Sequence, residues 1–298
     1  MNLIVAVPVD EALASFMGKK GSANSITFYN RKEGGDVIVA LLPSQDEDKT
    51  YALAESLLVA SSVVLSTANL DKRFGEALVA CSLLDKKVLV TDDNDASALL
   101  KDAGLRDYSI VSRSDLLVRL RETASAQADG PVRVDIDKAF PVKGIGTVVL
   151  GFVTRGTLRQ HDKLFHTSGK EVLVRSMQSQ DEDITTAITG TRVGISLKDI
   201  GDKEVEKGDL LTTQAVAKRG TLTIEYRVGK MARESVVEGA RYGIASNFSY
   251  SECTVKSASG STLVLELTSP FPAEPGDRVL LIRKQLPRIF AAGSVGKA

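Results

Sequence analysis

The sequence predicts a multidomain α/β + β protein, in which an α/β domain over residues 1–125 precedes two β-barrels over residues 131–216 and 218–298. Three observations carry this prediction. Apolar runs alternate with amphipathic segments through the first 125 residues. Helical periodicity nearly vanishes after Pro131, where short β-branched runs separated by Gly, Asp and Lys begin. A second set of such runs starts near residue 221, and both sets are typical of β-barrels.

The first domain is predicted from its strand and helix periods. Buried strands are expected at 3–7, 37–42, 63–66, 88–91 and 108–111, with a further strand at 26–29. Helices are expected at 11–16, 49–58, 71–84, 96–103 and 115–122. In the third helix, Phe74, Leu78, Cys81 and Leu84 recur at the spacing of one helix face. Such strand–helix alternation predicts a mostly parallel sheet covered on both faces.

The small, polar stretch 123–130 is predicted to be a linker. Strands of the first barrel are expected at 133–140, 146–153, 162–166, 171–178 and 191–197. Residues 213–220 are the expected join, and strands of the second barrel are expected at 221–228, 242–246, 251–257, 262–268 and 278–282.

Composition indicates a globular chain with an ample core, since 43% of the 298 residues are hydrophobic and 26% are charged. The formal net charge is zero, so overall charge does not indicate a nucleic-acid binder. Residues 218–298 nevertheless hold 12 basic and 7 acidic residues, a balance of +5. Cys81 and Cys253 are expected to be core or free thiols in a reducing cytosol. The apolar start is too short to span a membrane, and a cytoplasmic protein is expected.

Residues 132–211 carry a specific set of motifs. The pattern K-G-x-G-T-V-V-x-G covers 143–151, R-G-T-L covers 155–158, and E-x-G-D-x-L covers 206–211 with its glycine at 208. This segment resembles the second domain of the translational GTPases of the SelB/EF-Tu family. The version of the pattern at Ser176 and Gln178 resembles SelB more than bacterial EF-Tu. The glycines Gly144 and Gly146 are expected to permit a tight bend and close backbone approach at a barrel corner.

The resemblance extends to both ends of the chain. Residues 218–298 resemble the third-domain barrel of that family, with Pro275-Gly276-Asp277 and Pro287-Arg288-Ile289 near the end. Residues 18–30 resemble EF-Pyl, the SelB-like factor of pyrrolysine-using methanogens. The resemblance therefore implies a P-loop-GTPase-like α/β domain followed by two β-barrels.

The motifs that bind and hydrolyse GTP are missing from the first domain. A P-loop reads G-x-x-x-x-G-K-[ST], with amides around the phosphates and a hydroxyl on magnesium. Here the first strand runs into Pro8, Asp10 and Glu11, and the first glycine is Gly18. Pro8 lacks an amide donor, and the two carboxylates would repel a triphosphate while favouring the start of a helix.

Neither Asp-x-x-Gly nor Asn-Lys-x-Asp occurs in the chain. Asp92 or Asp93 could imitate the guanine-reading carboxylate, and a helix cap and turn is the alternative. Because phosphate, magnesium and base recognition fail together, the sequence predicts a degenerate GTPase-like domain that is not an enzyme and takes no cofactor. His161 and His166 have no cysteine neighbour, so no metal site is predicted.

The resemblance implies partners and a site. In the relatives, the second domain holds the aminoacyl-adenosine end of charged tRNA in a pocket facing the GTPase domain. Carried over by position, that pocket would involve Gly144, Gly146, Thr147, Gln178 and Arg192. The amide of Gln178 could hydrogen-bond a base, and Arg192 could meet a phosphate or a carbonyl.

A small basic cluster lies near the C-terminus. Arg283, Lys284 and Arg288 are candidate contacts for RNA phosphates, and a solvated face is the alternative. The expected partners are aminoacyl-tRNA, the ribosome or both. Two other functions stay open: a regulatory or scaffold protein that binds a protein partner, and an active GTPase with an aberrant nucleotide loop.

Overall fold

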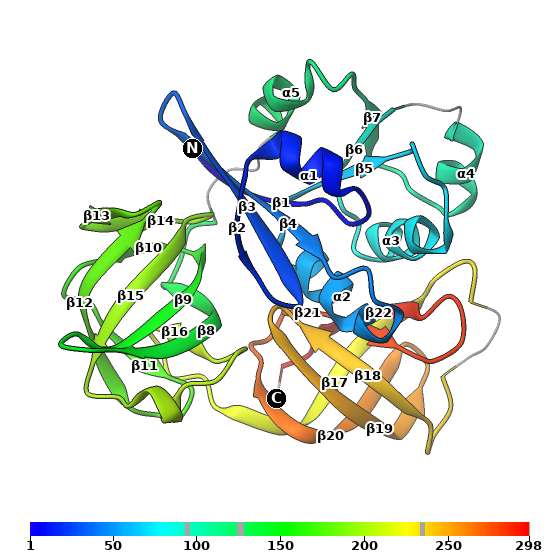
Figure 1. The fold of residues 1–298 in the computed structure, drawn as a ribbon. Coiled ribbons are helices and arrows are strands. Elements are labelled where there is room, and N and C mark those ends of the chain that lie inside the picture. Colours follow the sequence, from blue (N-terminus) through cyan, green and yellow to red (C-terminus); the bar gives the residue numbers. More distant parts are fainter. Residues whose placement is uncertain (93–95, 124–127, 233–235, 298) are drawn as a thin grey trace.

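The structure is a computed structural model that describes residues 1–92, 96–123, 128–232 and 236–297. It forms three parts, which we name the front domain (residues 1–123), the middle barrel (128–212) and the last barrel (218–297). In Figure 1 the front domain lies at the top, the middle barrel at the left and the last barrel below. The predicted order of one α/β domain and two β-barrels is confirmed. Part of the predicted linker 123–130 lies outside the described residues, and the exact domain boundaries stay a prediction.

The front domain is built on a seven-stranded sheet of order β2-β3-β4-β1-β5-β6-β7. Its strands are β1 (Asn2–Ala6), β2 (Lys19–Ala23), β3 (Ile26–Glu33), β4 (Asp36–Pro43), β5 (Ser62–Ser66), β6 (Val88–Thr91) and β7 (Tyr108–Ile110). Adjacent strands run parallel along the part of the sheet ordered β4-β1-β5-β6-β7, whereas β2 pairs antiparallel with β3 and β3 with β4. The sheet is therefore mostly parallel, as the strand–helix alternation predicted.

Helices cover both faces of this sheet. They are α1 (Glu11–Met17), α2 (Thr50–Val59, after a 3₁₀ turn at Glu47–Lys49), α3 (Lys72–Leu83), α4 (Ser97–Asp102) and α5 (Leu116–Glu122). Leu3 and Val5 of β1 join the core beneath α1 and α5, while Ile4 and Ala6 join the core beneath α2 and α3. Because β1 is covered on both sides, its sequence is continuously apolar rather than alternating.

The middle barrel closes by strand pairing from β11 through β16, β8, β9, β15 and β12 back to β11. Its strands are β8 (Arg133–Val142), β9 (Gly146–Arg155), β11 (Lys163–His166), β12 (Glu171–Ser179), β15 (Arg192–Lys198) and β16 (Leu210–Thr212). The strand β13 (Glu182–Ile184) extends β12, and β10 (Thr157–Arg159) pairs with β14 (Thr186–Ile188).

The last barrel is a closed sheet of order β17-β20-β19-β18-β21-β22. Its strands are β17 (Lys218–Val228), β18 (Arg241–Ser246), β19 (Ser249–Ser259), β20 (Thr262–Pro272), β21 (Arg278–Ile282) and β22 (Ile289–Val295). Cys253 lies in this barrel and Cys81 in α3, and both are buried free thiols, as predicted. Burial raises the pKa of each thiol to about 12.

The strands that the sequence did not predict are β2, β10, β13, β14, β16 and β22. Most are three to five residues long, too short for an alternating pattern. The acidic residues Glu182 and Asp183 pair with β12 as part of β13. The expected join at 213–220 is shorter than predicted, because β17 already begins at Lys218.

The glycines of the middle barrel have two different roles. Gly144 and Gly146 take φ of 80° and 101°, so the bend that the sequence predicted is confirmed. The expected close backbone approach there is wrong, since a Cβ at either position would have no neighbour within 4 Å. Close approach occurs instead at Gly190, where a Cβ would strike the Asn2 carbonyl, and at Gly208, where it would lie 2.6 Å from the Ser249 hydroxyl. These two glycines let the middle barrel meet the front domain and the last barrel.

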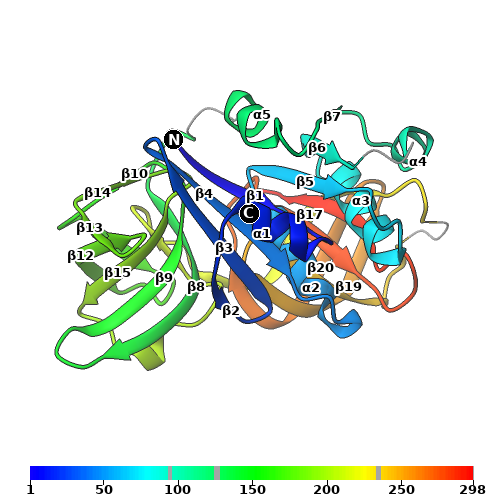
Figure 2. The same ribbon diagram turned by 45° about the horizontal axis from the view of Figure 1, so that its top comes forward.

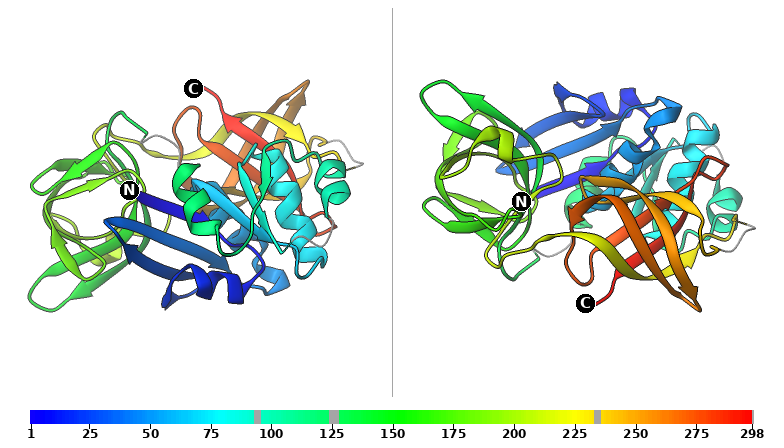
Figure 3. Two further views of the ribbon diagram at one scale, coloured as in Figure 1. Left: turned by 90° about the horizontal axis from the view of Figure 1, so that it is seen from above. Right: turned by 90° about the horizontal axis from the view of Figure 1, so that it is seen from below.

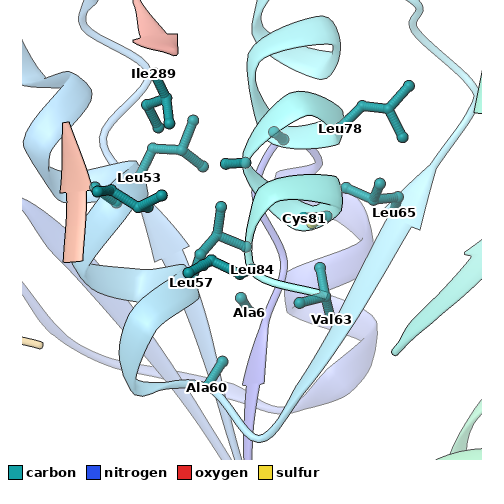
Figure 4. Close-up of a cluster of buried hydrophobic side chains, with 14 of the residues drawn as sticks. Ala6, Leu53, Leu57, Ala60, Val63, Leu65, Leu78, Cys81, Leu84 and Ile289 are labelled. Carbon is teal, nitrogen blue, oxygen red and sulfur yellow. The ribbon is translucent and has the colours of Figure 1, made fainter. Parts of the chain in front are cut away.

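The front domain rests on the last barrel through α2 and α3. Figure 4 shows Leu53 of α2 close to Ile289 of β22, and Leu57 of α2 beside Leu84, which follows α3. These side chains belong to one buried cluster that crosses the domain boundary. Polar contacts close its rim: Arg227 and Arg278 both donate to the Leu83 carbonyl, at 2.6 and 3.0 Å, where cations complement the end of α3.

Three phenylalanines join all three parts. The Phe152 ring of β9 lies 6.0 Å from Phe28 of β3 and 5.9 Å from Phe248, in the turn between β18 and β19, measured between ring centroids. All three rings are buried. Figure 2 shows how β2 and β3 run beside β8 and β9, and Figure 3 shows both barrels against the front domain from above and below. We call the three residues Phe28, Phe152 and Phe248 the phenylalanine junction.

An ion pair between a buried carboxylate and an exposed lysine borders the phenylalanine junction. Lys207 of the middle barrel donates to the Glu55 carboxylate of α2 at 2.6 Å, and its ammonium lies 5.9 Å from the rings of both Tyr51 and Phe248. Burial raises the pKa of Glu55 to about 7, although the Lys207 charge acts in the opposite direction. The front domain and the middle barrel are thus joined by charge as well as by ring contacts.

The two roles of glycine predict different costs of substitution. Gly144→Ala should cost about 1–2 kcal/mol, because alanine disfavours a left-handed backbone. Gly208→Ala has the same backbone cost, with φ of 89°, and adds contact with Ser249 of the last barrel. Thermal unfolding of both variants should therefore show the larger loss for Gly208→Ala. Equal losses of stability would mean that Ser249 of the last barrel moves aside at no measurable cost.

Candidate functional site

Open α/β sheets bind ligands outside the carboxyl ends of their parallel strands, so the loops after β1, β5 and β6 form the first site to consider. After β1 the chain runs through Pro8 to Asp10, whose Oδ1 accepts a hydrogen bond from the Leu13 amide at 2.8 Å and caps α1. The helix start that was predicted for the acidic pair is confirmed. The neighbouring Glu11 accepts hydrogen bonds from Lys20 and Tyr29, at 2.8 and 3.0 Å.

Arg113 connects the loops at this edge. Its Nε and Nη2 donate to both carboxylate oxygens of Asp92, at 2.7 and 2.8 Å, and Nη2 also lies 3.2 Å from Asp10 Oδ2. Asp92 Oδ2 accepts a further hydrogen bond from Ser66, at 2.9 Å. The hydrogen bonds from Arg113 and Ser66 hold the pKa of Asp92 below its ordinary value. Asp92 is therefore committed to an internal ion pair, and Asp93 lies outside the described residues.

The loop after β4 is held at the same edge. Gln45 Nε2 donates to the carbonyls of Pro8 and Pro43, at 3.1 and 2.7 Å, and the Arg73 guanidinium donates to Ser44 at 2.5 Å. The segment that leads into α2 is thus fastened to the segment that leads into α1.

The second site is a cavity of about 340 Å³ between the β2–β3 hairpin and the middle barrel. Two of the five residues predicted for the tRNA end, Gln178 and Arg192, line it together with Ser22 and Asn30. Neutral amides and hydroxyls dominate its polar lining: Ser22, Asn30, Gln178, Ser179 and Gln180, with Asp181 and Arg192 as charged members. Such a wall offers hydrogen-bond donors and acceptors to a polar ligand.

Arg192 is the central cation of this cavity. Its guanidinium lies 4.0 Å from the centre of the Phe28 ring, and Nη2 donates to the Ser22 hydroxyl at 2.9 Å. Its Nε is buried and has no hydrogen-bond partner in the structure. Burial lowers the pKa of Arg192, and the nearby negative charge of Asp137 acts in the opposite direction. An acceptor atom of a ligand would complete the hydrogen bonding of this side chain.

Gly144, Gly146 and Thr147 lie away from this cavity. Thr147 is buried and donates to the Ile200 carbonyl at 2.7 Å, while the cavity is lined on β9 by Leu150. Three residues of strand separate them, roughly 10 Å at about 3.3 Å per residue. Arg175 also fastens the hairpin tip by donating to the Ile145 carbonyl at 3.1 Å. The structure therefore unites Gln178 and Arg192 and separates the other three predicted residues from them.

The three basic residues near the C-terminus differ in their surroundings. Arg288 forms an ion pair with the buried Glu76 of α3, at 3.2 Å. The Arg283 guanidinium lies 4.9 Å from the centre of the Phe290 ring and donates to the Pro287 carbonyl at 3.1 Å. Only Lys284 of the three is exposed. Their role as contacts for RNA phosphates stays a prediction.

Arg283, Lys284 and Arg288 all line a cavity of about 620 Å³ between the start of α2 and the last barrel. Arg241, which is also exposed, and Tyr250, which is 41% exposed, lie on its wall. The Tyr51 and Tyr250 rings are 5.4 Å apart. Cations beside exposed aromatic rings are the groups that bind phosphates and stack on bases in single-stranded nucleic acids.

No group of three His, Cys, Asp or Glu side chains that could hold a metal ion occurs within residues 1–92, 96–123, 128–232 and 236–297. His166 is buried, and its Nε2 lies 3.1 Å from Asp209. No helix of the described chain is long and apolar enough to cross a membrane.

Comparisons with known proteins add to this geometry. The family model for elongation factor Tu domain 2 matches residues 146–212. An uncharacterized protein of Methanocaldococcus jannaschii is 27% identical over 282 residues, which cover 91% of this chain and 92% of that protein. The selenocysteine-specific elongation factor of Haemophilus influenzae is 22% identical over 221 residues, and the match spans 69% of this chain but only 33% of that factor.

The whole fold is also that of a solved translation factor. Elongation factor SelB from Methanococcus maripaludis, crystallised with the GTP analogue GppNHp, matches with a TM-score of 0.81 and 18% identity. The match covers 99% of this chain and 79% of that one. The fold and the middle barrel together define the three-part architecture of translation elongation factors. Residues 146–212 therefore carry an elongation factor Tu domain 2, and the chain as a whole shares the fold of SelB. The resemblance to EF-Pyl stays a prediction.

Several residues of these sites were missed from the sequence. Arg113 directly follows the predicted strand 108–111, so the rule that ligand edges lie after parallel strands could have found it. Ser22 and Asn30 belong to the segment that resembles EF-Pyl, but the unpredicted strand β2 hid their contact with the middle barrel. Arg241 and Tyr250 had no sequence signal, because only the fold of the last barrel brings them to Lys284.

Proposed function

We propose that this chain is a SelB/EF-Tu-like carrier that binds the acceptor end of aminoacyl-tRNA, or ribosomal RNA, without binding or hydrolysing GTP. The observation that carries the proposal is the cavity between the β2–β3 hairpin and the middle barrel. Gln178 and Arg192 line it, and the buried Nε of Arg192 lacks a hydrogen-bond partner there. A carbonyl, hydroxyl or phosphate oxygen of the RNA end would supply the missing acceptor.

The proposed loss of GTP binding has support from both motif and geometry. The chain lacks the P-loop, Asp-x-x-Gly and Asn-Lys-x-Asp patterns. The cap of α1 is the Asp10 carboxylate, and Asp92 already pairs with Arg113. A triphosphate would bring further negative charge toward these carboxylates without an amide cradle or a lysine to offset it.

The cavity beside Lys284 supports RNA as the class of ligand. Exposed cations and the Tyr51–Tyr250 pair lie at the boundary between the front domain and the last barrel. The proposal gives phosphate binding to Lys284 and Arg241, and it leaves Arg288 with the structural role of neutralising Glu76.

GTP and its analogues should leave the protein unchanged. Calorimetry with GTP or GDP and Mg²⁺ should show no saturable heat at micromolar concentrations. Neither the thermal midpoint nor the solution scattering profile should change when a GTP analogue is added. Because a ligand that binds only the folded state raises its stability, a shift of a few degrees would contradict the proposal.

Charged tRNA should bind more tightly than uncharged tRNA in a filter-binding assay. Gln178→Ala should weaken the binding of charged tRNA about five- to tenfold, the cost of roughly one hydrogen bond, without lowering the thermal midpoint. Gln160→Ala is a matched control, because Gln160 lies in the same barrel, donates only to the Arg175 carbonyl and does not line the cavity. Equal, weak and salt-abolished binding of both tRNAs would defeat the proposal.

Substitutions of the basic residues should distinguish side chains that bind phosphate from one that stabilises the fold. Lys284→Ala and Arg241→Ala should each weaken RNA binding and reduce the slope of log affinity against log salt by about 1. Arg288→Ala should instead lower the thermal midpoint, since it removes the 3.2 Å ion pair of the buried Glu76 and leaves the longer contact with Arg73, at 4.0 Å. If Lys284→Ala and Arg241→Ala leave the slope unchanged, this cavity does not bind phosphate.

A further inference from the structure

We infer that Arg113 is an internal brace that replaces a bound nucleotide: it orders the loops at the ligand edge of the front domain, so that α2 keeps its place on the last barrel without any ligand. The inference rests on the proposed absence of a nucleotide and goes beyond it, because it assigns the ordering role to named side chains.

The brace joins three loops through one guanidinium. Arg113 lies in the segment between β7 and α5, Asp92 follows β6, and Asp10 lies between β1 and α1. The contact with Asp92 is bidentate, at 2.7 and 2.8 Å, and the Asp10 contact is 3.2 Å long. Two parallel N–H···O bonds fix both distance and orientation, so this contact sets the geometry of the edge.

Further hydrogen bonds extend the brace to the remaining loops. Ser66, at the end of β5, donates to Asp92 at 2.9 Å and accepts from the Ala68 amide at 3.2 Å. Gln45 ties the loop after β4 to Pro8. Every parallel strand from β4 to β7 thus ends in a loop that a side-chain hydrogen bond fastens to a neighbour.

The brace has a structural path to the last barrel. The loop that Gln45 holds leads through the 3₁₀ turn Glu47–Lys49 into α2. Leu53 and Leu57 of α2 then pack in the cluster that contains Ile289 of the last barrel. A change in the loops would therefore be transmitted to the seam between the front domain and the last barrel, and to the cavity that Tyr51 lines.

One positive charge at this edge thus offsets part of the charge of two carboxylates. The guanidinium faces the two carboxylates of Asp92 and Asp10. All three side chains are at most about one-third exposed, with accessible fractions of 36% for Arg113, 25% for Asp92 and 16% for Asp10. A partly shielded, bidentate contact is stronger than an isolated surface ion pair.

Hydrogen–deuterium exchange of the full chain tests the brace with the variant Arg113→Met, which keeps the aliphatic stem and removes the donors. Amides of residues 7–13, 44–46 and 66–68 should exchange about tenfold faster or more, because Arg113 holds Asp10 and Asp92 directly and the other loops through Ser66 and Gln45. Asp92→Asn should produce the same pattern in weaker form. Asp10→Ser keeps a good helix cap and should loosen only residues 7–13.

Arg119→Met is the matched control, because Arg119 pairs with Glu122 at 2.8 Å on the surface of α5 and touches none of these loops. It should leave exchange at the edge unchanged. The inference is overturned if Arg113→Met also leaves the edge unchanged while the chain stays folded. Should Arg113→Met unfold the chain, Asp92→Asn and Asp10→Ser decide by the same exchange pattern.

The proposed function fails separately from this inference. Binding of GTP to the unaltered chain would remove the proposed function, whatever the exchange results are. Unchanged exchange in Arg113→Met, with no GTP binding, would remove only the brace.

Discussion

The contact of Phe28, Phe152 and Phe248 is the constraint on which the arrangement of the three parts depends. Each ring comes from a different part, and each is buried. Aromatic side chains bury large areas and prefer a few geometries, so three successive rings fix position as well as attraction. The Arg192 guanidinium lies on the outer face of Phe28, which means that the polar cavity and the apolar junction share one ring. The site is therefore only as well positioned as the junction beside it.

Carboxylates of the front domain are paired with cations in two different places. At the ligand edge, two carboxylates of the chain meet Arg113, so part of their negative charge is offset internally. At the seam with the barrels, Glu55 is almost fully buried and depends on Lys207 of the middle barrel for its partner. Removing Lys207 would leave the buried Glu55 carboxylate without this partner, which costs more than breaking a pair of two exposed side chains. Both arrangements favour one placement of the front domain, and neither uses a ligand.

Much of the fold could be predicted because the front domain has clear periodicity: Phe74, Leu78, Cys81 and Leu84 are all buried, as their spacing required. The short strands β2, β13 and β14 could not, since so few residues carry no usable period. The glycines show the second limit. Positive φ at Gly144 was accessible from sequence, whereas the contact of Gly208 with Ser249 depends on a domain 41 residues further along the chain. For the candidate site, the resemblance supplied Gln178 and Arg192, but their partners Ser22 and Asn30 are set by tertiary packing.

The shared core has a consequence for how the chain can be divided. The buried cluster of the front domain includes Phe152 of the middle barrel together with Phe248 and Ile289 of the last. Cutting the polypeptide between the parts would expose these apolar surfaces to water on both fragments. Isolated pieces should then be prone to self-association, and unfolding of the intact molecule should be one concerted event rather than three independent ones.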